Sequence, residues 1–176
     1  MHCIAAVSEN WGIGKNNQLL YHIPDDMKFF RNMTLNRTVI MGRNTYKSIG
    51  KPLPKRECNV ILTSDTKFEP KKDKTTHTIQ IHTLEQLLGI YAKDSNAFII
   101  GGARLYESCL DYCETAYITL IHDVKPADTF FPNLYTRPNW EIDWYKPEKT
   151  YEGITYQHMI FKNKNVKPYV PTITKP

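Results

Sequence analysis

Short apolar runs alternate with segments of helical pattern from the amino terminus to about residue 110, and this alternation constrains the fold more than any other feature of the chain. The apolar runs have the length and the β-branched content of buried strands, at residues 2–7, 37–42, 59–63, 78–82 and 97–100. The helical patterns lie at residues 24–34, 43–49, 83–92 and 103–110. Alternation of this kind predicts a largely parallel sheet covered by helices.

The pattern changes after Thr115. Three further strands are expected at residues 117–121, 140–145 and 155–161, without helical segments between them, so the carboxyl-terminal edge of the sheet should be antiparallel. We therefore predict an α/β fold with a single domain, in which helices flank a mixed, mostly parallel central sheet with an antiparallel C-terminal edge. The domain should span residues 1–162, and residues 163–176 should form an extended tail that contains lysine and proline.

The 176 residues are 41% hydrophobic and 23% charged, as in an ordinary globular protein, and no apolar run is long enough to cross a bilayer. Because the first residues also lack a secretory signal, we expect a cytoplasmic protein without a membrane partner. The formal charge of +5 comes largely from lysines near the C-terminus, and the body has no basic tract typical of nucleic-acid binding. The four cysteines form no CxxC pair, which favours reduced, buried thiols and no metal site.

The segment Pro24-Asp25-Asp26 places two acids at the start of an expected helix. Proline and acidic residues are both favoured in the first turn of a helix. At about 100° per residue, Asp25 points away from the apolar stripe, and we interpret it as an ordinary helix-start carboxylate. Asp26 falls inside the stripe, between Phe30 and Met33, where desolvation would raise its pKa. A carboxyl group with a raised pKa suits acid–base chemistry near neutral pH.

Three of the expected strands end in glycine, hydroxyl or arginine residues. These ends are Gly42-Arg43-Asn44-Thr45, Thr63-Ser64 and Gly101-Gly102-Ala103-Arg104. In open α/β sheets, ligands bind at the carboxyl ends of strands, where glycine lets the backbone approach a phosphate and a helix start supplies N–H donors. Each end taken alone is explained as a tight turn, and none is a GxGxxG fingerprint. Three of them in one sheet favour an extended ligand with several charges.

Several segments, in this order and at this spacing, together resemble the dihydrofolate reductase family. They are IAA at residues 4–6, the loop at 12–26 that ends in Asp26, VIMGRNTYKSIGKPLP at 39–54, IGGARLY at 100–106 and DTFFP at 128–132. The resemblance covers residues 4–161 and is to the shorter, bacterial, monofunctional form. It implies an NADPH-dependent oxidoreductase that reduces 7,8-dihydrofolate to 5,6,7,8-tetrahydrofolate, supplies one-carbon metabolism and is an antifolate target. NADPH is then the expected cofactor, dihydrofolate or an antifolate the small-molecule partner, and a monomer the expected state.

The resemblance also implies roles for particular residues. Asp26 matches the carboxylate that holds the pterin ring and supports its protonation, and Thr119 matches the hydroxyl that shares its hydrogen bonds. Tyr21 stands where the family usually has a tryptophan that holds a water near the carboxylate. Leu19 lies in the loop of residues 9–23, which we expect to be a mobile lid, and completes the implied catalytic set. The implied substrate-binding residues are Ile4, Ala6, Asp26, Met27, Phe30, Ile49, Leu53, Arg56, Ile100, Tyr106 and Thr119.

Two arginines have specific implied partners. Arg43, with Thr63 and Ser64, would hold the 2′-phosphate of the cofactor, so that NADPH is preferred over NADH. Arg56 would bind the glutamate α-carboxylate of the substrate, although an apparent insertion at Glu57-Cys58 would bulge the strand and displace it. The implied cofactor-binding residues are Ala6, Ile13, Gly42, Arg43, Asn44, Thr45, Leu62, Thr63, Ser64, Gly101, Gly102, Ala103, Arg104, Leu105 and Tyr106.

Two alternatives keep the same fold. One is a pyrimidine reductase of riboflavin synthesis, against which the combination of Asp26 and Arg56 argues. The other is a noncatalytic NADPH-binding or scaffold relative, in which we would expect loss of the carboxylate or of Arg43, and both are present.

Overall fold

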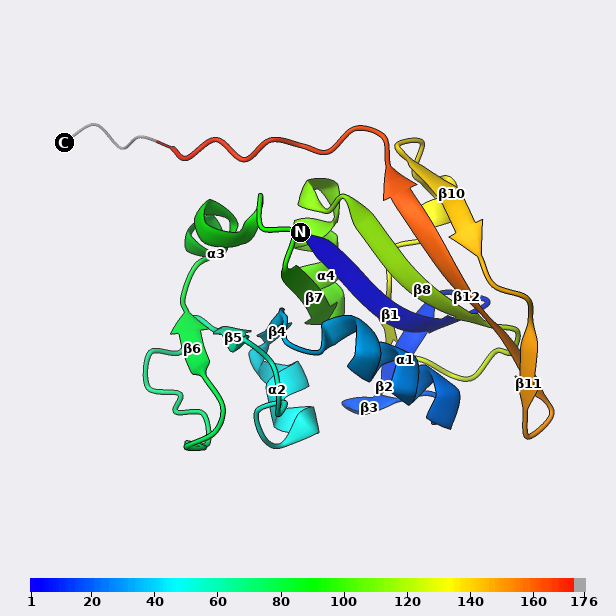
Figure 1. Ribbon diagram of the computed structural model, residues 1–176, viewed down its shortest axis with the longest axis horizontal. Coiled ribbons are helices and arrows are strands. Elements are labelled where there is room, and N and C mark those ends of the chain that lie inside the picture. Colours follow the sequence, from blue (N-terminus) through cyan, green and yellow to red (C-terminus); the bar gives the residue numbers. More distant parts are fainter. Residues whose placement is uncertain (173–176) are drawn as a thin grey trace.

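A mixed sheet crosses the molecule in the computed structural model, which describes residues 1–172 (Figure 1). Its strands are, in spatial order, β10 (Trp140–Tyr145), β12 (Ile154–Asn163), β8 (Thr115–Ile121), β1 (His2–Ser8), β7 (Ala97–Gly101), β4 (Thr38–Gly42), β5 (Cys58–Leu62) and β6 (Thr78–Ile81), and β11 (Lys149–Tyr151) also pairs with β12. The pairs from β8 to β6 are parallel, whereas β12 pairs antiparallel with β8, β10 and β11. The predicted fold class is therefore confirmed.

Helices cover both faces of this sheet. They are α1 (Pro24–Thr34), α2 (Arg43–Ile49), α3 (Leu84–Tyr91) and α4 (Ala103–Cys109), with the 3-10 helices η1 (Leu110–Tyr112) and η2 (Leu134–Thr136). Successive side chains of a strand point to opposite faces. Ile40 of β4 packs in one core with Leu105 of α4, while its neighbours Val39 and Met41 pack in another with Tyr46 of α2. Consequently α4 lies on one face of the sheet and α2 on the other.

The ends of α1 and α2 coincide with the predicted ones because the chain marks them locally. Pro24 occupies the first turn of α1, where its missing N–H removes no helical hydrogen bond. Gly50, at φ +84°, closes α2 by donating its N–H to the carbonyl of Tyr46. This left-handed conformation favours glycine.

The loop expected at residues 9–23 contains strands that the sequence pattern did not indicate. β2 (Gly12–Lys15) and β3 (Gln18–Leu19) form a hairpin, and β2 also pairs with β9 (Thr129–Phe130) in a second sheet. Asn16 and Asn17 turn the hairpin at φ +51° and +59°, a conformation that asparagine tolerates. Strands this short show no alternation of their own, so their pairing depends on distant partners.

The tail that follows β12 runs along the body over residues 164–172. The backbone N–H of Lys167 donates to the carbonyl of Asp111 at 2.8 Å, and the ring of Tyr169 meets that of Tyr112 edge to face. The last four residues of the predicted tail, 173–176, lie outside the described residues.

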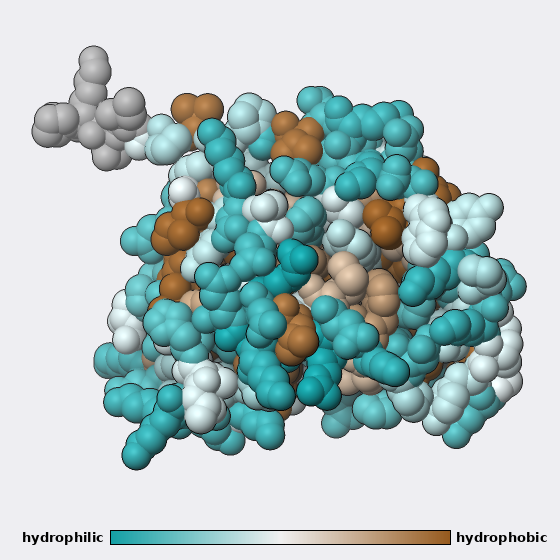
Figure 2. Space-filling model, in the orientation of Figure 1, coloured by the Kyte–Doolittle hydropathy of each residue, from teal (hydrophilic) through white to brown (hydrophobic). Residues whose placement is uncertain are grey.

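Cys3, Cys58, Cys109 and Cys113 are buried free thiols, as predicted. The face drawn in Figure 2 is largely hydrophilic, and apolar side chains reach its surface in separate patches. Within residues 1–172, none of the helices combines the length and the apolar character needed to span a membrane.

Candidate active site

A cleft of about 900 Å³ lies beside α1, with β1, α2, α4 and the ends of β4, β5 and β7 in its walls. The three strand ends singled out in the sequence meet here, at residues 42–45, 62–64 and 100–104. Parallel strands bring their carboxyl ends to one edge of a sheet, which explains why segments so distant in the chain converge. The volume is within the range of sites that bind small molecules and cofactors.

Asp26 reaches this cleft from the first turn of α1. Because β1 and β8 pair with Ala6 opposite Thr119, the side chains of these two residues share one face of the sheet. The Thr119 hydroxyl lies 2.6 Å from Oδ1 of Asp26 and donates to it when the carboxyl group is ionised. Burial raises the pKa of the Asp26 carboxyl, and the hydrogen bond from Thr119 opposes that rise only in part. Asp26 therefore takes up a proton more readily than an ordinary aspartate.

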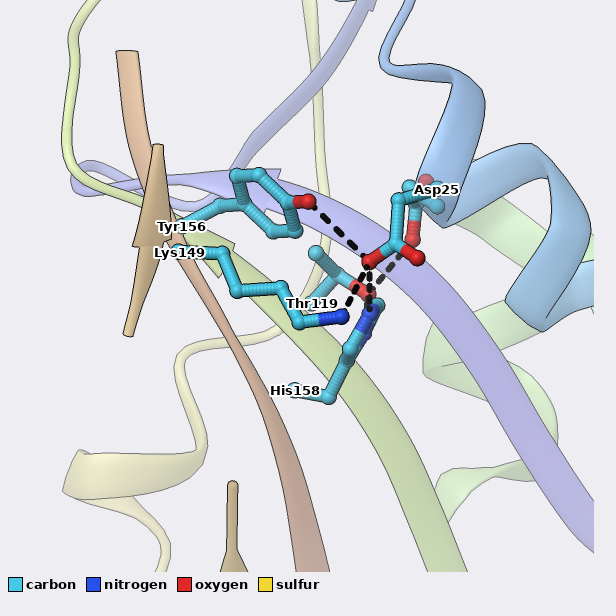
Figure 3. Close-up of polar contacts among 6 residues, drawn as sticks. Asp25, Thr119, Lys149, Tyr156 and His158 are labelled. Carbon is cyan, nitrogen blue, oxygen red and sulfur yellow. Dashed lines mark hydrogen bonds and ion pairs between the residues drawn. The ribbon is translucent and has the colours of Figure 1, made fainter. Parts of the chain in front are cut away.

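Asp25 belongs to a second polar cluster, on the side of α1 that faces β11 and β12 (Figure 3). Its Oδ2 accepts hydrogen bonds from Tyr156 at 3.0 Å and Lys149 at 3.1 Å, and lies 3.3 Å from Nε2 of His158. Desolvation by burial opposes ionisation of Asp25, but these three partners outweigh it and lower the pKa of the carboxyl. The interpretation of Asp25 as an ordinary helix-start acid needs correction, because side chains of two distant strands engage it.

His158 connects the two acids. It stands opposite Thr119 in the antiparallel pair of β12 and β8, and its Nδ1 lies 2.8 Å from the Thr119 hydroxyl. The residue is 4% exposed, and its ring stacks on Phe29 with 4.2 Å between ring centroids. Burial lowers the pKa of His158, which its contacts with the two carboxylates offset only in part. The sequence pattern did not point to His158, because a single strand histidine carries no motif; only its register with Thr119 distinguishes it.

Two residues of the apolar stripe of α1, Met27 and Phe30, line the cleft. Of the α1 residues only Thr34 is buried, and Met27 is 39% exposed. The structure brings all the apolar residues predicted for the substrate to the walls of the cleft: Ile4, Ala6, Met27, Phe30, Ile49, Leu53, Ile100 and Tyr106.

The residues predicted for the cofactor line the same cleft without exception. Gly101 has φ +130°, and a Cβ added there would lie 3.3 Å from the Thr45 hydroxyl of α2. A Cβ added at Gly102 would meet the same oxygen, also at 3.3 Å. The two glycines therefore let β7 approach α2 closely and leave backbone open to a ligand.

Arg56 does not line the cleft but packs behind its wall. Its guanidinium lies 5.8 Å from the ring centroid of Phe30, donates to the hydroxyl of Thr34 at 2.8 Å and to the carbonyl of Pro54 at 2.7 Å. From Cys58 onward β5 keeps a continuous register with β4, so no bulge lies within Cys58–Leu62. Arg56 therefore lies beside Phe30, which itself lines the cleft.

Of the two other residues predicted to be catalytic, Leu19 lines the cleft and Tyr21 does not. The ring of Tyr21 lies 4.4 Å from the ammonium of Lys125, and burial together with the charge of Asp123 raises the pKa of Tyr21 to about 12. Leu19, on β3, is 66% exposed.

Several lining residues were not among the predicted site residues. Ser48 of α2 donates to the carbonyl of Asn17 at 2.5 Å, which ties the β2–β3 hairpin to the opposite side of the cleft. The positions of Gly14, Asn17 and Gln18 depend on how this hairpin folds over the sheet. The lining residues that were not predicted are Ala5, Gly14, Asn17, Gln18, Ser48, Leu84, Ser108 and Thr129.

Comparison with known proteins agrees over nearly the whole chain. The dihydrofolate reductase family model matches residues 1–164. A dihydrofolate reductase of Staphylococcus aureus is 39% identical over 154 residues, which are 85% of this chain and 91% of the relative, and one of Bacillus subtilis is 34% identical over 166 residues, or 92% and 94%. The structure also resembles that of dihydrofolate reductase from Enterococcus faecalis complexed with NADP(H) and RAB-propyl, at a TM-score of 0.79 and 28% identity, with 92% of this chain and 95% of that chain covered.

Proposed function

The chain belongs to the dihydrofolate reductase family, and on this premise we propose which of its residues carry out the NADPH-dependent reduction of 7,8-dihydrofolate to 5,6,7,8-tetrahydrofolate. NADPH supplies the hydride when it is bound. The protein must then hold the pterin ring, exclude water and support protonation of the imine nitrogen. The observation that carries the assignment is the carboxyl of Asp26, which lines the cleft and is hydrogen-bonded to Thr119 at 2.6 Å.

Asp26 holds the pterin ring. An ionised carboxylate offers two acceptor oxygens, which match the adjacent amino and ring N–H donors of the pyrimidine side of the pterin. Thr119 fixes one oxygen of the carboxylate and so sets its orientation. The raised pKa of Asp26 makes its protonated form more accessible than that of an ordinary aspartate, which supports proton delivery to the imine nitrogen through water.

The apolar walls supply the low dielectric that this chemistry needs. Ile4, Met27 and Phe30 lie on the lining beside Asp26, and Ile49 and Leu53 extend the same wall. Rings stacked against these side chains exclude water, which strengthens the hydrogen bonds of the carboxylate. The β2–β3 hairpin, which presents Leu19 to the cleft, acts as the lid.

The other half of the cleft fits a phosphorylated dinucleotide. Arg43 lines the cleft together with Thr63 and Ser64, a guanidinium with hydroxyl groups of the kind that binds a phosphate dianion. The open backbone at Gly101 and Gly102 suits close approach of the nicotinamide, as the distances to Thr45 indicate. Asn44, Thr45, Ala103 and Arg104 would hold the pyrophosphate between α2 and α4.

Arg56 binds the glutamate α-carboxylate of the substrate. All three of its nitrogens are anchored, Nε and Nη2 on Thr34 and Nη1 on Pro54, so the side chain is held at the end of the wall formed by Phe30. A guanidinium fork pairs with a carboxylate through two parallel hydrogen bonds.

The first experiment is the dihydrofolate-dependent loss of NADPH absorbance with purified protein, beside the variants Asp26→Asn and Asp143→Asn. Asp143 is an exposed acid of β10 and serves as the matched control. We expect turnover by the unmodified enzyme and by Asp143→Asn, and a loss on the order of 10² or more in Asp26→Asn, with partial recovery at low pH. Full activity of Asp26→Asn at neutral pH would refute the role of this carboxylate.

We also propose that the enzyme is cytoplasmic and acts as a monomer. Its four cysteines are free thiols, as is usual in a reducing compartment. Size-exclusion chromatography with light scattering tests the monomer directly, and a mass twice that of the chain would contradict it.

A further inference from the structure

Four side chains form a continuous line of polar contacts from the partly exposed Asp25 to Asp26, which lines the cleft, and Figure 3 labels the first three of them, Asp25, His158 and Thr119. Asp25 Oδ2 faces Nε2 of His158 at 3.3 Å, Nδ1 of His158 faces the Thr119 hydroxyl at 2.8 Å, and that hydroxyl faces Oδ1 of Asp26 at 2.6 Å. Asp25 is 40% exposed, whereas the His158 side chain is 5% exposed. The line therefore leads from solvent through a buried imidazole to the carboxyl of the proposed active site.

The hydrogens along this line can be counted. Asp25 is ionised and accepts from Tyr156 and Lys149 as well, so the Nε2 of His158 that faces it must carry a hydrogen. In a neutral imidazole, Nδ1 is then an acceptor, and the single hydrogen of Thr119 must point to it. Nothing remains on Thr119 to satisfy an ionised Asp26 at 2.6 Å, and two acceptors would face each other.

One additional proton removes the clash between the two acceptors. It can reside on Asp26 or on His158. If Asp26 is protonated, it donates to Thr119, and Thr119 donates to the neutral His158. If His158 is protonated, its Nδ1 donates to Thr119, and Thr119 donates to the ionised Asp26. Both arrangements pair every group, and both carry the same total charge.

We propose that His158, oriented by Asp25, is a positioning residue that holds the proton shared with Asp26 and exchanges it through the Thr119 hydroxyl. In the exchange, the O–H bond of Asp26 breaks as its proton passes to Thr119, and the original proton of Thr119 passes to Nδ1 of His158. A neutral acid and a neutral imidazole become a carboxylate and an imidazolium beside Asp25. The role rests on the function proposed above, because it describes how Asp26 ionises to hold the substrate ring and is protonated again afterwards.

The surroundings favour the proton on Asp26 when the cleft holds no substrate. Burial raises the pKa of Asp26 and lowers that of His158, so both groups tend toward the neutral form. The titratable and charged groups that face His158 are Asp25 and Asp26 on α1, Lys146 after β10, Lys149 on β11 and Tyr156 on β12. The two sites should titrate as one coupled pair.

Single-turnover hydride transfer measured across pH tests the proposal, with the variants His158→Phe and Asp25→Asn. Phenylalanine keeps a ring against Phe29 but removes Nδ1, and asparagine lets the imidazole adopt either tautomer. In both variants Thr119 becomes free to donate to an ionised Asp26. We expect the midpoint of the profile to fall by about one pH unit, which lowers the rate about tenfold on the alkaline side and leaves the acid plateau within about twofold.

Lys149→Met is the matched control, because Lys149 contacts the same oxygen of Asp25 from outside the line and should leave the midpoint unchanged. Profiles of both test variants that superimpose on that of the unmodified enzyme would overturn the proposal, and so would an equal loss at every pH. If His158→Phe does not fold, Asp25→Asn decides alone.

Nuclear magnetic resonance of isotope-labelled histidine gives a second result that needs no turnover. We expect His158 to be the neutral tautomer with hydrogen on Nε2 near neutral pH in the substrate-free protein. A hydrogen on Nδ1 of the neutral ring would contradict the hydrogen positions assigned above to His158 and Thr119. Because this measurement is independent of dihydrofolate, failure of the proposed enzymatic function and failure of the proton count give different results.

Discussion

The guanidinium of Arg43 is paired with the carboxylate of Asp65, with 2.8 Å between Nη1 and Oδ2. The two side chains are 37% and 42% exposed, so the pair itself adds little stability. Asp65 is in turn held by its neighbours, since its backbone N–H donates to the hydroxyl of Thr63. The pairing therefore keeps Arg43 next to the hydroxyl groups with which it would bind a phosphate.

Arg43→Gln should remove most of the preference for NADPH over NADH. Charge-assisted hydrogen bonds contribute about 1.5–3 kcal/mol, so we expect the Kd for NADPH to rise about 10- to 100-fold while that for NADH changes little. Fluorescence titration with both cofactors measures the two constants. Lys47→Gln, an exposed change on the same helix, is the control, and equal losses for both cofactors in Arg43→Gln would show that the residue does not read the 2′-phosphate.

Asp26→Asn should stabilise the fold at neutral pH although it removes activity. The pKa of Asp26 is raised above its ordinary value of 3.8, so the ionised form is unfavourable in the folded protein and stability falls as pH rises through this range. We expect a Tm that is roughly 2–4 °C higher than that of the unmodified protein at pH 7. Thermal unfolding at several pH values should show the gain vanish below the ordinary pKa. A lower Tm at pH 7 would contradict this account.

Asp25→Asn should have the opposite effect on stability and destabilise the fold at neutral pH. The pKa of Asp25 is lowered below 3.8, so its charged form stabilises the fold above that pH, and the contribution is lost as pH falls through the lowered pKa. Because the side chain is 40% exposed, solvent screening limits the effect to less than about 1 kcal/mol. The same unfolding series should show a small loss at pH 7 that disappears in acid, and a gain in its place would be inconsistent with the contacts to Tyr156 and Lys149.

Gly101→Ala should weaken the binding of NADPH. The added Cβ would lie 3.3 Å from the Thr45 hydroxyl, which must shift by a few tenths of an ångström, and φ +130° strains a residue with a side chain. Gly153→Ala is the matched control, because Gly153 also has a positive φ, of +78°, but faces open space. We expect both variants to lose stability, on the order of 1 kcal/mol, and only Gly101→Ala to lose NADPH affinity, by about tenfold or more. Equal affinities in the two variants would show that the close approach is not needed.

Arg56→Gln should weaken binding of the substrate and leave the cofactor unaffected. We expect KM for dihydrofolate to rise about 10- to 100-fold, since one charge-assisted pair is lost. Dihydropteroate, which lacks the glutamate, should be reduced equally well by the variant and the unmodified enzyme. Arg31→Gln, an exposed arginine on α1, controls for the change in net charge, and a loss with dihydropteroate as large as with dihydrofolate would argue against the carboxylate contact.

Much of this fold is predictable from local patterns in the chain. Pro24 and Gly50 mark helix ends by conformational restriction or freedom, and the runs around Ile40 and Ile99 are apolar enough to identify buried strands. The strands β2, β3, β9 and β11 are not predictable in this way, because each is at most four residues long and is stabilised by its partners.

In the candidate site, too, some residues are predictable from local patterns and others depend on distant partners. Asp26 is recognisable because a helix turns it into an apolar stripe, a relation between close neighbours in the sequence. For Asp25 the helix geometry predicts only which side of α1 the carboxylate is on. Whether it meets water or protein on that side depends on Tyr156 and His158 of β12, which are more than a hundred residues further along the chain. Partners of that kind follow from strand register, which no local pattern specifies.

The apolar side chains of α1 in the cleft link the stability of the protein to its ligands. Met27 and Phe30 of this helix line the cleft, and Met27 is 39% exposed, so the rings of a bound ligand would cover apolar surface that otherwise contacts water. Ligands that bind only the folded state shift the folding equilibrium by mass action. A cell that runs short of folate or NADPH should then degrade this protein faster, so that the amount of enzyme follows the supply of the molecules it consumes.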